Sequence, residues 1–235
     1  PWAGEAGHAD RVAAYYLCAN RGKRSAAIDL ATEEGAAAIR ALATKADVVI
    51  ENFKTGGLVK YGLDHVSLRA LNPRLVYCSI TGFGQDGPYA SRPGFASIAE
   101  SMAGLAAVSG DPNGPPMLPA IALTDETTGI AAAFATMVAL HSGVGQVVDI
   151  NLLTAVFQIM GPVISLYKLS GQLQPRLGSG LPYSVPRGVY QCNDDKWVGV
   201  SASSDSVAAR VMTVLGVGDD TRFATFTGRT ENRDE

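Results

Sequence analysis

The sequence predicts an α/β fold: a domain built on a parallel sheet, followed by the start of a smaller α+β unit. Strand-like and helix-like segments alternate over about 55 residues, the pattern that crossover helices between parallel strands produce. A stretch rich in glycine and proline then separates this part from two short strand-like runs. The predicted boundaries are a first domain at 1–170, a linker at 171–186 and a second unit at 187–235.

The first part of the chain alternates between strands and helices. Ser25–Leu30 is expected to form a strand, and Thr32–Thr44 an alanine-rich helix opened by its first residue. Ala46–Phe53 is a continuous apolar run that ends in polar residues, which is typical of a buried parallel strand. Asp64–Leu71 is expected to be a short helix capped by its aspartate, and Leu75–Ile80 the next strand.

Helices dominate the middle of the chain. A loop covers Gly82–Gly94, and the helices Phe95–Val108 and Glu126–His141 follow it. Val147–Ile150 is a short extended segment, and Leu152–Leu169 is an apolar helix interrupted by polar residues, a glycine and a proline. This apolar run is too short to span a bilayer, so we expect a buried helix with a break and no membrane partner.

The last part indicates a second unit that is incomplete. Gly188–Gln191 and Trp197–Ser201 resemble a hairpin, and Ser204–Leu215 a helix. Thr230–Glu235 resembles the start of another helix at which the chain stops, and the first residue is Pro1 instead of methionine. We therefore expect the chain to be a fragment of a longer protein.

The composition is that of an ordinary globular protein. Of 235 residues, 47% are hydrophobic and 17% charged, which excludes a disordered chain. Nineteen basic and 22 acidic residues give a net charge of −3, so no basic surface for a nucleic acid is expected.

Neither the cysteines nor the histidines indicate a site. Cys18, Cys78 and Cys192 are far apart and have no zinc-binding spacing, so we expect buried, reduced thiols in a cytoplasmic protein. No signal peptide is visible, which agrees with that location. The three histidines are scattered among loops and helix ends, so no metal site is predicted.

The loop Gly82–Gly87 matches the pattern G-x-G-x-x-G directly after a strand. Dinucleotide binding requires the last glycine to begin a helix, whose free amides then face the pyrophosphate. Pro88 and Pro93 prevent an immediate helix. The sequence therefore favours a glycine-rich loop at an active site or at the surface over a nucleotide site.

Two further groups of polar residues lie beside predicted strands. Arg21–Arg24 concentrates three positive charges and is either a solvated turn or a site for a phosphate, which such side chains bind well. Glu51–Phe53 lies where a predicted parallel strand ends, the place where ligands of α/β sheets collect, although ordinary loop polarity explains these residues equally well.

Asp125 directly precedes an alanine-rich helix and allows two interpretations. It can cap the helix by accepting hydrogen bonds from the amides of Thr127 or Thr128. It can also be a catalytic nucleophile, because the positive end of a helix stabilises an ionised carboxylate. The two roles compete for the same lone pairs.

Taken in order, several motifs resemble the family III CoA-transferases, which include formyl-CoA, carnitine-CoA and succinyl-CoA-type enzymes. The resemblance covers nearly the whole chain, and the order and spacing of the motifs make it specific. The motifs are Asn20–Ser25 with Asp29–Leu30, Ala46–Phe53, Leu71–Tyr77, Thr81–Pro88, Arg92–Phe95, Asp125 with Gly129, and Gly143–Asp149.

This resemblance implies a reaction and a set of site residues. Asp125 would attack an acyl-CoA thioester and pass coenzyme A to a carboxylic acid through anhydride and aspartyl-CoA intermediates. Coenzyme A would serve as a co-substrate, and no tightly bound cofactor is implied. The implied CoA-binding residues are Ile28, Asn52, Phe53, Lys60 and Tyr61, the candidates for binding a phosphate or a substrate anion are Lys23, Arg24 and Arg92, and the glycines whose amides would stabilise an oxyanion are Gly82, Gly84 and Gly87.

The resemblance also implies an interlocked homodimer. Each subunit would be a ring of a Rossmann-like large domain and a small domain, closed by a later segment that returns to the large domain. The shorter turn between Leu140 and Gly145 departs from the usual family pattern, and Lys60 stands where relatives can have arginine.

Residues near Arg92 that differ from the family's racemases favour some of the family's functions over others. The racemases of this family need a histidine base where this chain has Phe95, which cannot accept a proton. The pattern around Arg92 most resembles branches that act on dicarboxylic acids such as succinate, mesaconate or citramalate. An α-methylacyl-CoA racemase-like isomerase and a non-catalytic acyl-CoA-binding subunit are the alternatives.

Overall fold

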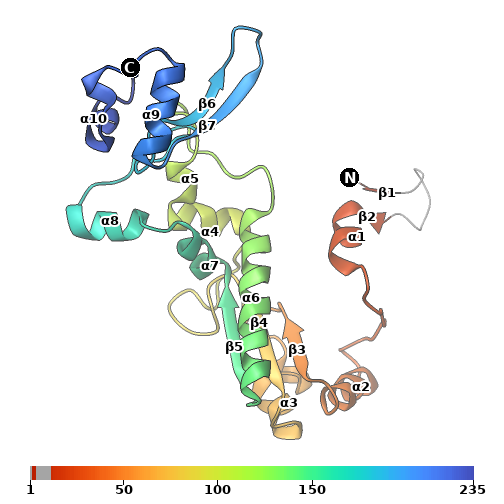
Figure 1. Cartoon of the computed structure of the whole chain (residues 1–235). Helices are drawn as coiled ribbons and strands as arrows, with labels where there is room; N and C mark the ends of the chain where they lie inside the picture. Colours follow the sequence, from red (N-terminus) through yellow and green to blue (C-terminus); the bar gives the residue numbers. More distant parts are fainter. Residues whose placement is uncertain (1, 4–11) are drawn as a thin grey trace.

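The computed structural model describes residues 2–3 and 12–235 and has a mixed α/β fold with a parallel sheet at its centre (Figure 1). The sheet consists of β3 (Val48–Glu51), β4 (Val76–Thr81) and β5 (Val147–Asn151), with β4 in the middle. Both neighbouring pairs are parallel. The predicted α/β class is therefore confirmed.

Helices cover both faces of this sheet. On one face, α2 (Glu33–Ala43) and α3 (His65–Leu71) share an apolar cluster with Tyr77. On the other face, the 20-residue helix α6 (Leu123–Ser142) packs over Cys78. Because neighbouring side chains of a strand point to opposite faces, β4 contributes to both clusters and joins the two layers.

The predicted helix caps are confirmed. The Thr32 side chain accepts a hydrogen bond from the Gly35 amide, and Asp64 accepts from the first amides of α3. Ser204 caps α9 (Asp205–Val214) in the same way. At these positions a local hydrogen bond between a side chain and an amide determines where the helix begins.

Two predicted helices are broken. Phe95–Val108 divides into α4 (Ala96–Ala103) and α5 (Leu105–Val108), because Gly104 adopts a φ of 90°. Leu152–Leu169 divides into α7 (Leu152–Ile159) and α8 (Val163–Ser170), which are bent by 74°. The break is confirmed, but α8 has no buried residue. Within the described residues, no single helix has the length and apolar character to cross a membrane; this bent pair satisfies those criteria by length and composition alone.

Smaller elements lie around this core. The predicted hairpin is confirmed as antiparallel strands β6 and β7, and α9 follows it. The predicted helix start at Thr230–Glu235 is wrong, because α10 already begins at Phe226, capped by Thr225. The bounds are β1 (Trp2–Ala3), β2 (Val12–Ala13), α1 (Ala14–Asn20), η1 (Val59–Tyr61), β6 (Arg187–Gln191), β7 (Trp197–Ser201), η2 (Thr221–Phe223) and α10 (Phe226–Glu231).

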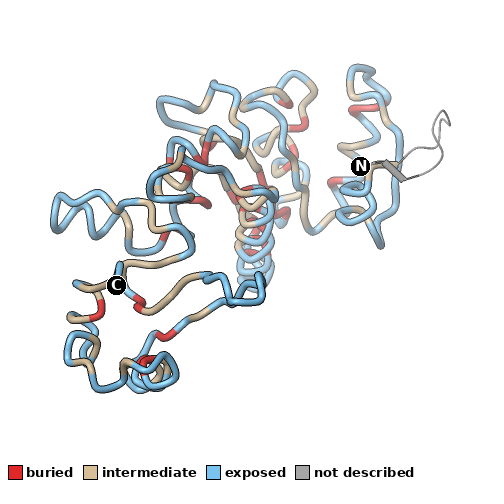
Figure 2. Tube along the Cα trace, turned by 90° about the horizontal axis from the view of Figure 1, so that it is seen from above, coloured by how far each residue is buried: buried red, intermediate tan, exposed pale blue. Residues whose placement is uncertain are grey.

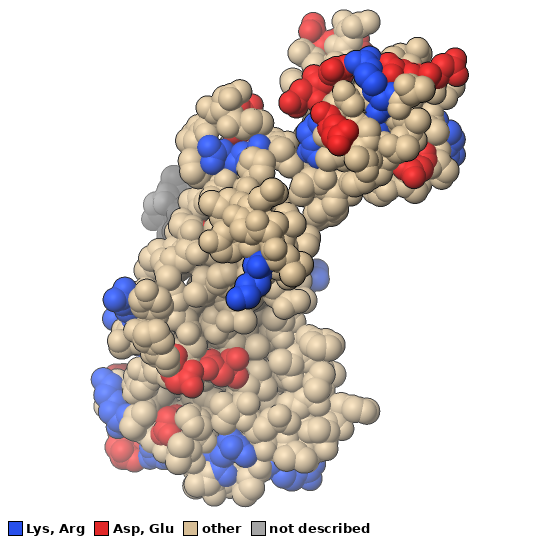
Figure 3. Space-filling model, turned by 90° about the vertical axis from the view of Figure 1, so that its left-hand side faces the viewer, with Lys and Arg blue, Asp and Glu red and all other residues tan. Residues whose placement is uncertain are grey.

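Burial and charge are unevenly distributed along the described chain. Buried residues occur as short stretches in a trace that is mostly exposed or intermediate (Figure 2). Charged side chains gather over the end that carries β6, β7, α9 and α10, whereas the middle of the viewed face is largely uncharged (Figure 3). The division into two domains and a linker at 171–186 stays a prediction.

The predicted strand Ser25–Leu30 is wrong. The segment is irregular, and β3 pairs only with β4 within the described residues. Alternation of small and apolar residues still leaves Ile28 and Leu30 partly buried, but a strand also needs a hydrogen-bonded neighbour. The alternating pattern therefore indicated which side chains are partly covered, but not a strand with hydrogen bonds to a neighbour.

The expectation for the cysteines is correct at one position. Cys78 is buried in β4, whereas Cys18 and Cys192 are exposed, and all three are free thiols. Cys18 belongs to α1, which has no buried residue, and Cys192 directly follows β6 at the hairpin. Neither segment packs against enough of the protein to cover a thiol.

Candidate active site

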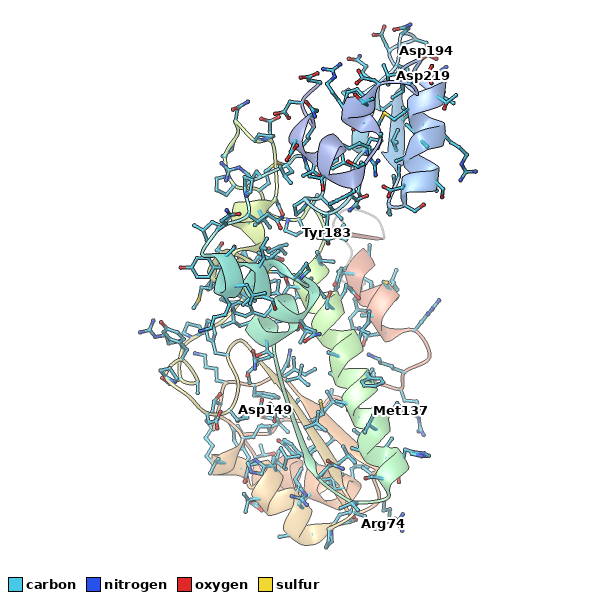
Figure 4. The ribbon with its side chains drawn as sticks, turned by 60° about the vertical axis from the view of Figure 1, so that its left-hand side comes forward. Arg74, Met137, Asp149, Tyr183, Asp194 and Asp219 are labelled. Carbon is cyan, nitrogen blue, oxygen red and sulfur yellow. The ribbon has the colours of Figure 1, made fainter. Side chains whose placement is uncertain are left out.

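A cavity of about 530 Å³ opens at the edge of the sheet where β3 and β4 end. The strand register places Glu51 beside Ser79 and Thr81 beside Asn151, so the carboxyl ends of the three strands meet there. Ligands of open α/β sheets bind at this edge. A smaller hollow of about 260 Å³ lies at the other end, near Arg74 (Figure 4). Position and size both favour the first cavity as the functional site.

Asp125 is the third residue of α6 and lines this cavity. The helix begins at Leu123 after Ala122, so Asp125 is not the N-cap and the capping interpretation is wrong. Thr124 is fully buried, and its hydroxyl donates to Glu100 of α4 at 2.8 Å. This tertiary contact fixes the backbone in the helix one residue before Asp125.

Three carboxyl groups lie around the start of α6, and two of them have protein partners. Glu100 accepts the Thr124 hydroxyl, and Glu126 accepts a hydrogen bond from the Tyr15 hydroxyl of α1 at 2.5 Å. That bond raises the pKa of Tyr15 to about 12. No hydrogen bond or ion pair to the Asp125 side chain occurs within the part of the chain that the structure describes. Asp125 is therefore the carboxylate with free lone pairs facing the cavity.

The surroundings of Asp125 raise its pKa above the usual range for aspartate. Partial desolvation of the carboxyl at the cavity wall is the largest cause, although the residue as a whole is exposed, and the nearby charges of Glu100 and Glu126 act in the same direction. The helix dipole opposes this shift, because the first turn of α6 presents a partial positive charge. A desolvated carboxylate is a stronger nucleophile than a fully hydrated one, provided that it is ionised at the working pH.

Four other predicted site residues lie around the same cavity. Asn52 and Phe53 follow β3, Gly82 follows β4, and Arg92 belongs to the loop before α4. Asn52 and Asp125 also line an adjoining hollow of about 320 Å³. The structure thus brings residues that are up to 73 positions apart in the sequence to one opening.

The remaining predicted residues lie elsewhere. Lys60 and Tyr61 form part of η1, where the Lys60 ammonium lies 4.6 Å from the centre of the Tyr61 ring. Ile28 lies in the irregular segment before α2, and Lys23 and Arg24 are exposed in that segment. None of these five residues lines the cavity of Asp125.

The glycine-rich loop touches the cavity at only one of its three predicted glycines. Gly82 lines the cavity and passes Gly94 so closely that a side-chain carbon on Gly82 would lie 2.5 Å from the Gly94 Cα. The Gly84 amide already donates to the Thr81 hydroxyl at 2.8 Å. The Gln85 backbone amide donates to the Asp149 carboxylate of β5 at 2.9 Å. Figure 4 labels Asp149. The expected oxyanion role of Gly84 therefore conflicts with its observed hydrogen bond, and Gly87 does not line the cavity.

Lys54 also belongs to this cavity, although no sequence motif indicated it. Lys54 lines the cavity together with Arg92 on a different segment, and Thr55 beside it donates to the Gly84 carbonyl at 3.5 Å. The available signal was its position directly after Asn52 and Phe53, where a parallel strand ends. Phe95, whose side chain cannot accept a proton, also lines the cavity and is 67% exposed.

Comparison with known proteins identifies the class to which this fold and site belong. Residues 3–235 match CoA-transferase family III, and the chain belongs to that family. The structure is similar to the crystal structure of a CaiB/BaiF family protein from Brucella suis, with a TM-score of 0.82 and 39% identity. That alignment covers 100% of this chain and 63% of the other.

Curated relatives within the family are CoA-transferases. The chain is 44% identical to succinate–glutarate CoA-transferase of Agrobacterium fabrum, covering 95% of this chain and 57% of that protein. It is 39% identical to succinyl-CoA–D-citramalate CoA-transferase of Chloroflexus aurantiacus, covering 92% and 55%. The human succinyl-CoA:glutarate CoA-transferase is 32% identical, covering 94% and 52%. The chain thus spans about half the length of the curated relatives it matches.

The charge of Glu100 should contribute measurably to the raised pKa of Asp125. Glu100→Gln keeps an oxygen that can accept the Thr124 hydroxyl but removes the negative charge, so the pKa of Asp125 should fall. Carbon NMR titration of the Asp125 carboxyl measures this directly, and the acid limb of any activity that needs ionised Asp125 should move to lower pH. Glu231→Gln on α10 is the matched control. An unchanged Asp125 titration in Glu100→Gln would contradict the electrostatic coupling.

Proposed function

We propose that this protein transfers coenzyme A between carboxylic acids through a covalent intermediate on Asp125. The observation that carries the proposal is the contrast among three neighbouring carboxyl groups. Glu100 and Glu126 accept hydrogen bonds from the protein, whereas Asp125 lines a cavity without such a partner in the described residues. Family membership supports the same chemistry.

In the proposed reaction Asp125 first carries the acyl group of the donor, then coenzyme A, and then the acyl group of the acceptor. One Asp125 oxygen attacks the thioester carbonyl, the C–S bond breaks, and the CoA thiolate leaves behind a mixed anhydride. The thiolate then attacks the aspartyl carbonyl, which releases the donor acid and forms an aspartyl-CoA thioester. The acceptor carboxylate attacks this thioester and releases the thiolate again. A final attack of the thiolate on the acceptor carbonyl forms the new acyl-CoA and restores Asp125.

The anhydride intermediate must be protected from water. Phe53, Phe95 and Leu152 supply apolar wall beside Asp125, and because Phe53 and Phe95 are 48% and 67% exposed, we propose that the bound substrate itself covers this wall and excludes water. We propose that Asn52 and Phe53 contact coenzyme A where it reaches Asp125. On the basis of the family resemblance we also propose that Ile28, Lys60 and Tyr61 bind the rest of coenzyme A. Lys23 and Arg24 would bind its phosphates.

A CoA-transferase fits the cavity better than the alternative functions. Racemisation beside a thioester carbonyl needs a base, and Phe95, which lines the cavity, cannot accept a proton. A non-catalytic acyl-CoA binder does not explain why Asp125 alone among the three carboxyl groups keeps its lone pairs free. Relatives named for succinate, glutarate and citramalate support short dicarboxylic acids as substrates.

We further propose that the active protein is a cytoplasmic homodimer of interlocked rings, in which this chain supplies the Rossmann-like domain and part of the small domain. Support comes from an apolar stripe on α6, where Ile130, Phe134 and Met137 are 71%, 71% and 62% exposed. Of these, Met137 is labelled in Figure 4, on the side of α6 away from the sheet. Residues spaced by three or four positions share one helix face, and monomers rarely expose such a stripe.

The dimer predicts a specific response to mutation. Phe134→Asp should shift the protein from the mass of two chains toward one in light scattering, because it places a charge in an apolar interface. Phe226→Asp on α10 is a matched exposed control that should leave the mass unchanged. A single-chain mass for the unmodified protein would contradict the homodimer, and co-purification with a different chain would indicate paired subunits, as in relatives named as α and β subunits.

Asp125→Asn should abolish CoA transfer while preserving the fold. The amide keeps the size of the side chain but cannot form the anhydride, so kcat should fall by at least about 10³-fold. Steady-state transfer assays and thermal unfolding check the two parts of this expectation. Glu126→Gln changes the adjacent carboxyl group and should keep activity within a few-fold. Retained turnover in Asp125→Asn would contradict the covalent mechanism.

A further inference from the structure

We propose that Lys54 and Arg92 form an anion subsite in the Asp125 cavity that binds the second carboxylate of a dicarboxylic acid. This inference rests on the proposed function. It adds an explanation of which carboxylic acid the site prefers, whereas the proposed function concerns only the reacting carboxyl group. It assigns a role to Lys54, which no sequence motif had indicated, and gives Arg92 one specific ligand.

The two cations approach the cavity from separate segments. Lys54 follows β3, and Arg92 lies in the loop between β4 and α4. Both residues line the same opening as Asp125 and are exposed, and neither side chain forms a salt bridge or a hydrogen bond within the described residues. Their charges are therefore available to a ligand.

An aromatic pair, Tyr89 and Phe83, orients Arg92. Its guanidinium lies 4.5 Å from the centre of the Tyr89 ring, and Tyr89 in turn packs against Phe83 at 5.6 Å. A cation–π contact engages one side of the guanidinium and leaves N–H groups free to bind a ligand. Those N–H groups match the two oxygens of a carboxylate. The aromatic pair therefore holds Arg92 in place for a bidentate interaction.

The charge balance of the cavity favours a dianion. Lys54 and Arg92 contribute two positive charges, and Asp125 is the only acidic residue among the lining residues. An acid with one carboxylate brings that group to the reaction at Asp125 and leaves both cations without a partner. An acid with two carboxylates satisfies the reaction and the cations together, and the apolar wall at Phe95 and Leu152 accommodates the methylene groups between them.

The second anion could belong to the acid or to a phosphate of coenzyme A, and the kinetics distinguish these sources. Glutarate and pentanoate have the same number of carbons but differ in the second carboxylate. With butanoyl-CoA as the donor, only glutarate carries a carboxylate beyond the reacting one. Arg92→Gln should raise the KM for glutarate by about 10- to 100-fold and Lys54→Gln by about tenfold, because each loses a charge-assisted bond.

The KM values for pentanoate and for butanoyl-CoA should stay within about twofold in both variants. Arg92→Lys should recover part of the glutarate affinity, because it keeps the charge but loses the fork. Arg74→Gln, at the other end of the sheet, is the matched control and should change none of these values. Titration calorimetry with glutarate provides the same comparison without turnover.

The possible failures are distinguishable. Equal use of glutarate and pentanoate by the unmodified protein and by both variants overturns the subsite and leaves CoA transfer intact. A rise in the KM for butanoyl-CoA equal to that for glutarate assigns the two cations to the phosphates of coenzyme A and also overturns the proposal. Absence of transfer to either acid, with calorimetric binding of glutarate unaffected by Arg92→Gln, overturns the proposed function and the subsite together.

Discussion

The site depends on one buried contact, the hydrogen bond between Thr124 and Glu100. It joins the first turn of α6 to α4, and the rest of α6 packs on the sheet through β4 and β5. Because the helix has already begun at Leu123, Asp125 is released from capping and lines a cavity at the carboxyl edge of the sheet. A residue that would otherwise stabilise a helix end thereby becomes available for chemistry.

This arrangement sets two electrostatic effects against each other. Partial desolvation and two neighbouring carboxyl groups raise the pKa of Asp125 and disfavour its ionised form. The partial positive charge at the first turn of α6 favours that form. The result is a carboxylate that is partly desolvated, exposed to the cavity and free of protein partners within the described residues, which suits attack on a thioester. Lys54 and Arg92 line the same cavity and provide the proposed place for a second negative charge, so the nucleophile and the residues that select the acid share one opening.

The sequence predicted those features that local chemistry decides. A continuous apolar run located β3, and Thr32 and Asp64 were found as caps because capping depends on residues within one turn. The status of Asp125 depended on a contact with Glu100, 24 positions away, which no local pattern reveals. Ser25–Leu30 has the pattern of a strand but no partner to pair with, and Lys54 became a cavity residue only when two distant loops met.

Chemical trapping tests the central claim most directly. The protein is incubated with an acyl-CoA and then treated with hydroxylamine, which converts an activated aspartyl group to a hydroxamate, and its peptides are measured by mass spectrometry. A covalent mechanism predicts a hydroxamate at Asp125 that depends on acyl-CoA and disappears when Asp125 is replaced by asparagine. Acyl-CoA turnover without a label, or with the label on Glu100 or Glu126, would contradict it.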